Sequence, residues 1–361
     1  MVHILHRQPE NAMDARPFDR SQKSHGSGAI LRHATSVDQR ISVVGIQPAR
    51  TGDWEDAQRA SPPATFFATT SWAAACAAAF PGLLSSPVRV RFSDGMECIL
   101  PLMRSRSRLR LNEYAGMPLG SYTALLPVTG GELVPAHYES LVRALGSIGD
   151  RVALTLWPLD PGLPPAGDPC FSTAAVDLTA GFEAVIAGWD GRARRMAGQA
   201  FRRGVRCEID RSSDAVGAYY ALLCDASERW GLDKPAIPAA LFEALHGSSD
   251  VEFWFAKLDN QVIAGGVMLY GRSEAFFFSA AMRAEFGTMR PSNALNSAMM
   301  QQACARGVRW YNLGASEGLP GVERFKRGLG ARLIAYGTHR SQSARSALVE
   351  RAKQLLRVRA S

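Results

Sequence analysis

The chain has 361 residues, 47% of them hydrophobic and 20% charged, which is the composition of a globular protein long enough for two domains of ordinary size. No run approaches the ~20 apolar residues that a membrane-spanning helix needs, and the N-terminus lacks the apolar core of a secretory signal. The net charge of +8 favours an anionic partner, such as a phosphate compound, RNA or an acidic membrane surface, without choosing among them.

The first 40 residues mix Pro, Ser, Gln, Arg and His without a hydrophobic period, so we expect a disordered extension over 1–40. Histidines in this extension are irregularly spaced, and the six cysteines of the chain are scattered without a CxxC pair. We therefore expect no metal site, reduced thiols and a cytoplasmic location.

The first half of the chain alternates strand and helix patterns. A strand is predicted at 41–46, an Ala-rich helix at 72–80 capped by Thr70 or Ser71, and a hairpin of 88–92 with 98–102. Four arginines then alternate along one face of an extended segment: Arg104, Arg106, Arg108 and Arg110. That face suits either phosphate binding or a solvated edge strand protected by charge.

A helix over 133–148 and strands over 152–157 and 173–178 complete this half, with a proline-rich loop at 158–169. We predict a first domain at 41–180, a second at 181–340 and a basic C-terminal helix within 341–361.

The second half opens with a basic amphipathic helix over 182–203, which stops at Gly204. Four of its arginines fall within an arc of about 100°, beside an apolar stripe: Arg192, Arg195, Arg202 and Arg203. A strand at 205–209, helices at 214–230 and 238–246, and antiparallel strands at 251–258, 261–270 and 274–281 follow. A helix from Pro291 to Arg306 then leads to a strand at 308–313.

The segment after that strand is turn-prone, with Gly314, Gly318, Pro320 and Gly321 as breakers. It ends in the basic cluster Arg324-Phe325-Lys326-Arg327. Loops at strand ends carry function because a rigid scaffold positions them, so this segment is a candidate site.

This order of elements resembles the GNAT acyltransferase fold, in its FemABX-like and BioF2-like (CelD-like) branch. The resemblance rests on the Arg-rich helix and Gly-Val of 194–205, the strand 259–268, the strand 307–314 and the Phe-Lys segment 321–330. In the first half, 66–72 and 95–102 resemble the opening of a GNAT-like unit. The resemblance implies an α/β (α+β) fold of tandem GNAT-like units with mixed central sheets, over about 41–340.

Such a fold catalyses acyl transfer from an activated carbonyl to an amine or hydroxyl. The resemblance implies that a parted central strand, here 262–267, offers backbone N–H groups to the donor, with Ala264, Gly265 and Gly266 at the contact. The alternative is that the two glycines relieve crowding beneath a helix.

Basic residues are the next candidates. Lys326 matches the lysine of the family's Phe-Lys segment, where it would neutralise a phosphate or developing negative charge; a solvated basic turn is the alternative. Arg195 and Arg202 are candidates for gripping a diphosphate or a nucleic-acid backbone. Ser292 and Asn293 open a helix whose N-terminus suits a phosphate.

The acceptor's proton needs a base. Glu317, Glu323 and Asp225 are candidates, with Tyr311 as a hydrogen-bonding partner, and the sequence does not rank them. The Gln/Arg-x-x-Gly-x-Gly/Ala pattern of many CoA-dependent members is absent from 282–293, so acyl-CoA and aminoacyl-tRNA both stay open as donors.

The sequence thus predicts an acyltransferase that uses acyl-CoA or aminoacyl-tRNA and no metal, with tRNA as a potential partner. Its acceptor would belong to a cell-envelope, polysaccharide or small-metabolite class. The competing hypothesis is a non-catalytic RNA-binding protein on a degenerate transferase fold.

Overall fold

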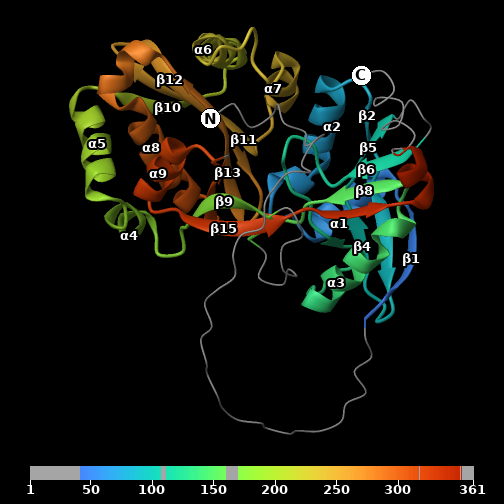
Figure 1. Cartoon of the computed structure of the whole chain (residues 1–361). Coiled ribbons are helices and arrows are strands. Elements are labelled where there is room, and N and C mark those ends of the chain that lie inside the picture. The colour runs from blue at the N-terminus through green and yellow to red at the C-terminus, as the bar shows by residue number, and fades with distance from the viewer. Residues whose placement is uncertain (1–40, 107–110, 160–169, 317, 350, 352–361) are drawn as a thin grey trace, which may run out of the picture.

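Two α/β units lie side by side in the computed structural model, which describes residues 41–106, 111–159, 170–316, 318–349 and 351 (Figure 1). The predicted extension 1–40, Arg108, Arg110 and most of the basic tail lie outside these residues. Within the described part of the chain, no helix is long and apolar enough to cross a membrane.

The first unit contains two small sheets with strand orders β1-β3-β4-β7 and β16-β8-β6-β5-β2. Its strands are β1 (Val43–Pro48), β2 (Leu83–Ser85), β3 (Val88–Phe92), β4 (Glu97–Leu100), β5 (Met103–Arg106), β6 (Asn112–Ala115), β7 (Leu126–Pro127) and β8 (Arg151–Leu154). Its helices are α1 (Thr51–Ala60), α2 (Thr70–Ala79) and α3 (Pro135–Ala144), with short 3-10 turns η2 (Phe66–Ala68) and η3 (Leu145–Ser147).

The predicted hairpin is confirmed, because β3 and β4 pair antiparallel with Val88 opposite Leu100. The predicted cap of the Ala-rich helix is off by one residue. Thr69 is extended, and its hydroxyl accepts a hydrogen bond from the backbone N–H of Trp72 at 3.2 Å. Helix α1 was not predicted from the sequence, and its only buried side chains are Trp54 and Ala57.

The second unit is built on one mixed sheet of order β10-β11-β12-β13-β14-β9-β15. Its strands are β9 (Cys170–Asp177), β10 (Arg206–Asp210), β11 (Val251–Leu258), β12 (Gln261–Tyr270), β13 (Glu274–Met282), β14 (Trp310–Ala315) and β15 (Arg332–Gly337). Its helices are α4 (Phe182–Ala187), α5 (Gly191–Arg202), α6 (Ala215–Arg229), α7 (Ala239–Leu245), α8 (Pro291–Ala305) and α9 (Pro320–Gly328), with the 3-10 helix η4 (Ala284–Met289) before α8.

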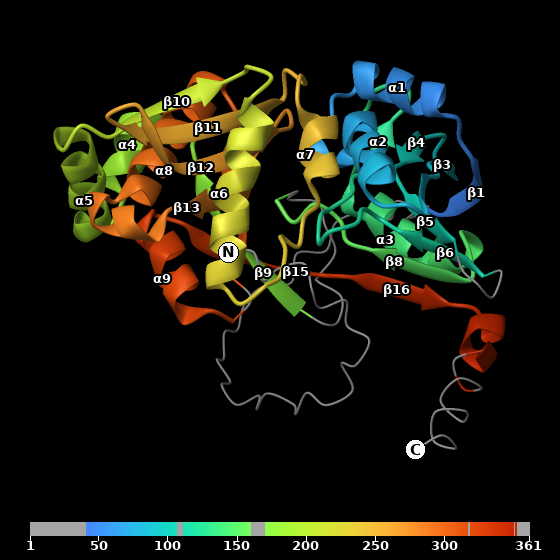
Figure 2. The ribbon, with the colours of Figure 1, turned by 90° about the horizontal axis from the view of Figure 1, so that it is seen from above.

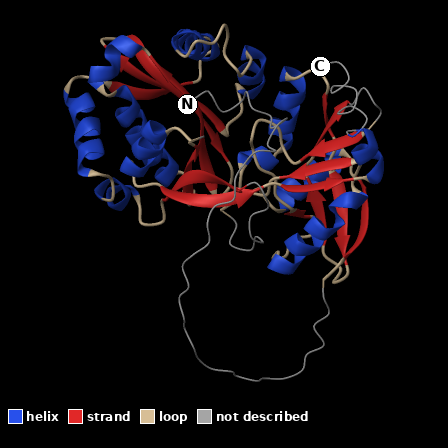
Figure 3. Ribbon diagram, viewed as in Figure 1, coloured by secondary structure: helices blue, strands red, loops and turns tan. Residues whose placement is uncertain are grey.

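Helices cover both faces of this sheet (Figure 3). α6 packs on β11, β12 and β13 from one side, and α8 packs on the same strands from the other, with α5 alongside it. The predicted single helix 182–203 is wrong, since it divides into α4 and α5. The division lies at Asp190, whose carboxylate caps α5 by accepting from the N–H of Arg192.

Two strands cross between the units. β9 precedes the predicted division at residue 180 but pairs with β14 and β15 of the second unit. β16 (His339–Gln342) follows the second unit but pairs with β8 of the first (Figure 2). The division at 180 therefore describes chain order, while strand pairing crosses it in both directions and ties the units together.

Candidate functional site

The parallel strands β13 and β14 part along their length. Their pairing covers only Glu274 to Phe276 on β13 and Trp310 to Asn312 on β14. β13 continues to Met282 and β14 to Ala315 without pairing with each other. Because the strands are parallel, their carboxyl ends lie at one edge of the sheet, where ligands of open α/β sheets bind.

The parting coincides with a bulge at Gly314. Between Asn312 and Ala315, β14 carries one residue more than its partner β9. Gly314 has φ of 72°, a left-handed conformation that suits glycine, and its N–H donates to Asn312 Oδ1 at 2.9 Å. The asparagine side chain thereby stabilises the bulge, which begins where the ladder to β13 ends.

The parting predicted at 262–267 is therefore in the wrong strand. β12 pairs with β11 on one side along this stretch, and with β13 on the other side from Ala264 onward. A Cβ on Gly265 would lie 3.1 Å from Tyr219 of α6, and one on Gly266 would lie 2.8 Å from Met299 of α8. These contacts match the alternative expectation that the glycines relieve crowding beneath helices.

The N-terminus of α8 follows β13 at the parted edge. Arg290, in the left-handed region with φ of 59°, precedes it without capping it by its side chain. Ser292 donates to the sulfur of Met282 at 3.4 Å, and Asn293 is buried in the same turn. Both predicted residues thus lie where the chain leaves β13 and turns back.

Several buried polar atoms at this edge have no hydrogen-bond partner among the described residues. They are Nε of Arg283, directly after β13, Nε of Arg290, directly before α8, and Oγ of Ser316, directly after β14. Unsatisfied buried donors are costly, so a group on a bound ligand is a natural acceptor for them. The sequence offered no signal for this set, because burial decides it.

A basic groove lies along α5. Arg192, Arg195 and Arg202 line a cavity of about 340 Å³ together with Met196 and Gln199. In the described part of the chain, the side chains of these three arginines have no hydrogen-bond or ion-pair partner, so their charges are available to an anion. Arg203 donates to the carbonyl of Thr288 at 3.0 Å, which places this end of α5 beside the segment that leads into α8.

The segment after β14 is a helix and not the predicted turn. Pro320 occupies the first turn of α9, where its missing N–H costs nothing, and the carboxylate of Glu323 pairs with Arg327 at 2.8 Å. A cavity of about 500 Å³ lies beside α9 and is lined by Asp190, Gly318, Pro320, Glu323, Arg324, Arg327 and Gly328. Of the two predicted bases that the structure describes, Glu323 and Asp225, only Glu323 borders one of these cavities.

Two other predicted catalytic residues, Lys326 and Tyr311, are buried and line neither of these cavities. Lys326 is fully buried, with Nζ donating to the carbonyls of Gly314 at 2.9 Å and Ala315 at 2.7 Å. Tyr311 is buried beneath α8, its hydroxyl donates to Asn296 Oδ1 at 3.0 Å, and burial raises its pKa well above the ordinary value. Asp225 is exposed on α6, and Glu317 lies outside the described residues.

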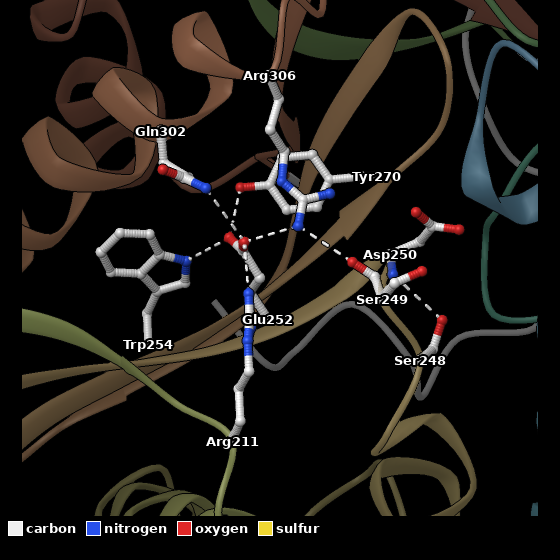
Figure 4. Close-up of polar contacts among 9 residues, drawn as sticks. All are labelled: Arg211, Ser248, Ser249, Asp250, Glu252, Trp254, Tyr270, Gln302 and Arg306. Atoms are coloured by element: carbon white, nitrogen blue, oxygen red, sulfur yellow. Dashed lines mark hydrogen bonds and ion pairs between the residues drawn. The ribbon is translucent and has the colours of Figure 1, made fainter.

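At the other end of α8 is a buried carboxylate that was not predicted from the sequence (Figure 4). Glu252 of β11 accepts hydrogen bonds from Trp254 at 3.0 Å and Tyr270 at 2.7 Å. It also accepts from Gln302 of α8 at 3.4 Å and from Arg306, directly after α8, at 2.8 Å. With its acceptors filled, this side chain joins α8 to the sheet, which in turn fixes where the N-terminus of α8 lies.

Comparison with known proteins shows what this geometry is similar to. Residues 190–327 match the family model described as Acetyltransferase (GNAT) domain. The solved structure of FemX is similar at a TM-score of 0.64 with 13% identity, over 84% of this chain and 98% of that chain. The C-terminal DUF2156 domain of a proposed lysylphosphatidylglycerol synthetase from Agrobacterium fabrum is similar at a TM-score of 0.48 with 16% identity, over 84% and 96%. A search of curated proteins by sequence finds no match.

The match to a GNAT acetyltransferase domain thus covers the segment that contains the parted strands β13 and β14. The chain as a whole has the fold of FemX, and the expected mixed α/β architecture is confirmed.

Proposed function

We propose that the protein moves an acyl group from a phosphate-bearing activated donor, acyl-CoA or aminoacyl-tRNA, to an amine or hydroxyl. The acceptor belongs to a cell-envelope, polysaccharide or small-metabolite class. The observation that carries this proposal is the parting of β13 from β14 at the edge where α8 begins and arginines gather.

The stretch of β13 that does not pair with β14, residues 277–282, supports a donor site. Its backbone groups on the side facing β14 lack ladder partners there, and an extended acyl arm can hydrogen-bond to them as an added strand would. Phosphates of the donor would lie on Arg195 and Arg202 in the groove of α5, since guanidinium groups bind phosphate in a bidentate manner. The first turn of α8, with Ser292 and Asn293, adds a partial positive charge at the same edge.

In the reaction, the acceptor's nitrogen or oxygen forms a bond to the donor's carbonyl carbon. The bond from that carbon to the thiol sulfur of CoA, or to the ribose oxygen of tRNA, breaks. A base takes the acceptor's proton, and the leaving group takes up one. Glu323 and Glu317 are our proposed bases, and Glu323 borders the 500 Å³ cavity in which an acceptor would bind.

A transfer assay with both donor classes tests the proposal. The purified protein is incubated with pooled acyl-CoA species or charged tRNA and with pooled amine and hydroxyl acceptors, and the products are identified by mass spectrometry. We expect one donor class to be consumed only when an acceptor is present. Consumption of neither class with any acceptor would contradict the proposal.

The three arginines that line the groove of α5 also support the alternative, a non-catalytic RNA-binding protein. That function predicts RNA affinity that falls steeply with salt, by a slope that reflects the number of phosphates contacted. It further predicts no acyl transfer in the assay above. Salt-dependent RNA binding together with turnover would instead favour aminoacyl-tRNA as the donor.

A further inference from the structure

Lys326 is a buried cation whose ammonium group is turned toward a strand end. Its side chain is fully buried, whereas Lys234 is exposed and Lys257 is half-buried and paired with Glu208 at 2.6 Å. Burying an ammonium group is costly unless its donors are satisfied. Here the carbonyls of Gly314 and Ala315 lie 2.9 Å and 2.7 Å from Nζ, so the lysine is held by the backbone of β14.

Lys326 binds Gly314, the residue at the bulge of β14. The N–H of Gly314 is bound by Asn312 Oδ1 at 2.9 Å, and its C=O is bound by Lys326 Nζ. Asn312 is in turn fixed by Thr173, whose hydroxyl donates to the same Oδ1 at 2.6 Å, and by Glu274, which accepts from its amide at 2.7 Å. Both polar groups of Gly314 therefore have side-chain partners.

This arrangement has a consequence for the parting of the sheet. Pairing between β13 and β14 stops at Asn312, two residues before the bulge. Beyond that point the carbonyls of Gly314 and Ala315 are bound to the ammonium group, which holds the end of β14 to α9. The same contact attaches α9, and with it the wall of the 500 Å³ cavity, to the end of β14.

We infer that Lys326 is a positioning residue that keeps the end of β14 parted from β13, and that it does not itself contact the acyl donor. This inference rests on the proposed function for its kinetic consequence, but the structural role stands independently. A lysine that met substrate would need its ammonium group at a cavity surface, and the lining residues of both cavities do not include it.

Amine labelling of the folded full-length protein tests the burial. A water-soluble acylating reagent followed by peptide mass spectrometry should modify Lys234 readily and leave Lys326 unmodified, with or without donor. Rapid labelling of Lys326 in the native protein, or labelling that the donor suppresses, would overturn the inference.

Kinetics of Lys326→Met, with Lys257→Met as the matched lysine control, test the positioning role. We expect hydrogen exchange of the Leu313–Ser316 amides to accelerate and the KM for the donor to rise about tenfold or more in Lys326→Met. The pH dependence of kcat should keep its shape, because Lys326 transfers no proton. Loss of one limb of that profile, or a fall in kcat with an unchanged donor KM, would show a direct catalytic role.

A second variant guards against misfolding of the first. Gly314→Ala disturbs the same bulge while leaving Lys326 in place, since alanine is strained at φ of 72° and its Cβ would lie 3.3 Å from the Phe276 ring. It should raise the donor KM as Lys326→Met does. An unchanged KM in Gly314→Ala would overturn the inference. If the wild-type protein consumed no donor, the proposed function would fail, while labelling and hydrogen exchange would still decide the role of Lys326.

Discussion

The guanidinium of Arg306 lies 2.8 Å from the carboxylate of Glu252 and, at the same time, 4.0 Å above the ring of Tyr270. Arg306 follows the last residue of α8, and Glu252 is completely buried on β11. One end of α8 is thus fixed to the sheet by a charge pair, while its other end lies at the parted edge.

Arg306→Ala should therefore lower the free energy of unfolding by roughly 3 kcal/mol, because it leaves Glu252 buried with one cationic partner fewer. Chemical denaturation measures this. The control is Arg309→Ala, which removes an exposed pair with Asp177 at 3.6 Å and should cost less than about 1 kcal/mol. Equal losses in the two variants would show that the buried pair carries no special weight.

Glu274 predicts a dependence of stability on pH. Burial raises the pKa of this carboxyl above its ordinary value of 4.5. The folded protein therefore holds the proton more tightly than the unfolded chain. Below pH 4.5 both states hold the proton, and its contribution to stability is complete. As the pH rises from there, the unfolded chain releases the proton while the folded protein keeps it, so the contribution falls and is lost once the pH has passed the folded pKa.

Glu274→Gln removes this titration, so its free energy of unfolding should fall less between pH 5 and 8 than that of the wild type, as measured by urea denaturation over about four pH values. Glu139→Gln, on the exposed face of α3, serves as the control and should keep the wild-type slope. A wild-type slope in Glu274→Gln would mean that other groups cause the dependence.

Gly266 should be required for packing. Alanine there would place Cβ 2.8 Å from Met299 Cε and 2.8 Å from the Phe277 ring, so Gly266→Ala should cost about 1–3 kcal/mol of stability. Adding Met299→Ala opens space at one of these contacts and should recover part of the loss in a double-mutant cycle. If the two substitutions were simply additive and Gly266→Ala instead abolished donor binding, the original expectation of a donor contact would regain support.

The groove of α5 offers a test within one helix. Arg195→Ala and Arg202→Ala should each raise the KM for the donor by about tenfold, which corresponds to one lost charge-assisted contact of ~1.4 kcal/mol. Arg194→Ala is the matched control, because Arg194 lies on the other side of α5 and donates to the carbonyl of Ala187 at 3.2 Å. A similar rise in KM for Arg194→Ala would point to general charge and not to the groove.

Local patterns predicted much of this fold. The alternation and turn residues of 251–281 gave β11, β12 and β13 nearly to the residue, and Pro291 marked the start of α8. The glycines and Pro320 after β14 suggested a turn, because breakers dominate short windows, although proline is well tolerated in a first helical turn. Local reasoning thus failed where one residue type suits two structures.

Long-range pairing was out of reach of the sequence. β9 and β16 each pair with a strand of the other unit that lies more than a hundred residues away in the chain, and no local periodicity indicates such a partner. Burial was equally hidden, since Lys326 lies between Phe325 and Arg327 in a basic cluster that resembles a solvated one. The arginine arc of α5 was found because amphipathicity is local, and three of its four members line one cavity.

Hydrogen exchange with the donor present tests the central claim most directly, because it reports where the donor binds. We predict that saturating acyl-CoA or aminoacyl-tRNA slows exchange in residues 277–282 of β13, at the end of β14 and in the first turn of α8. Protection confined to the first unit, or to β10 and β11 at the far edge of the sheet, would contradict the donor site proposed at the parted edge.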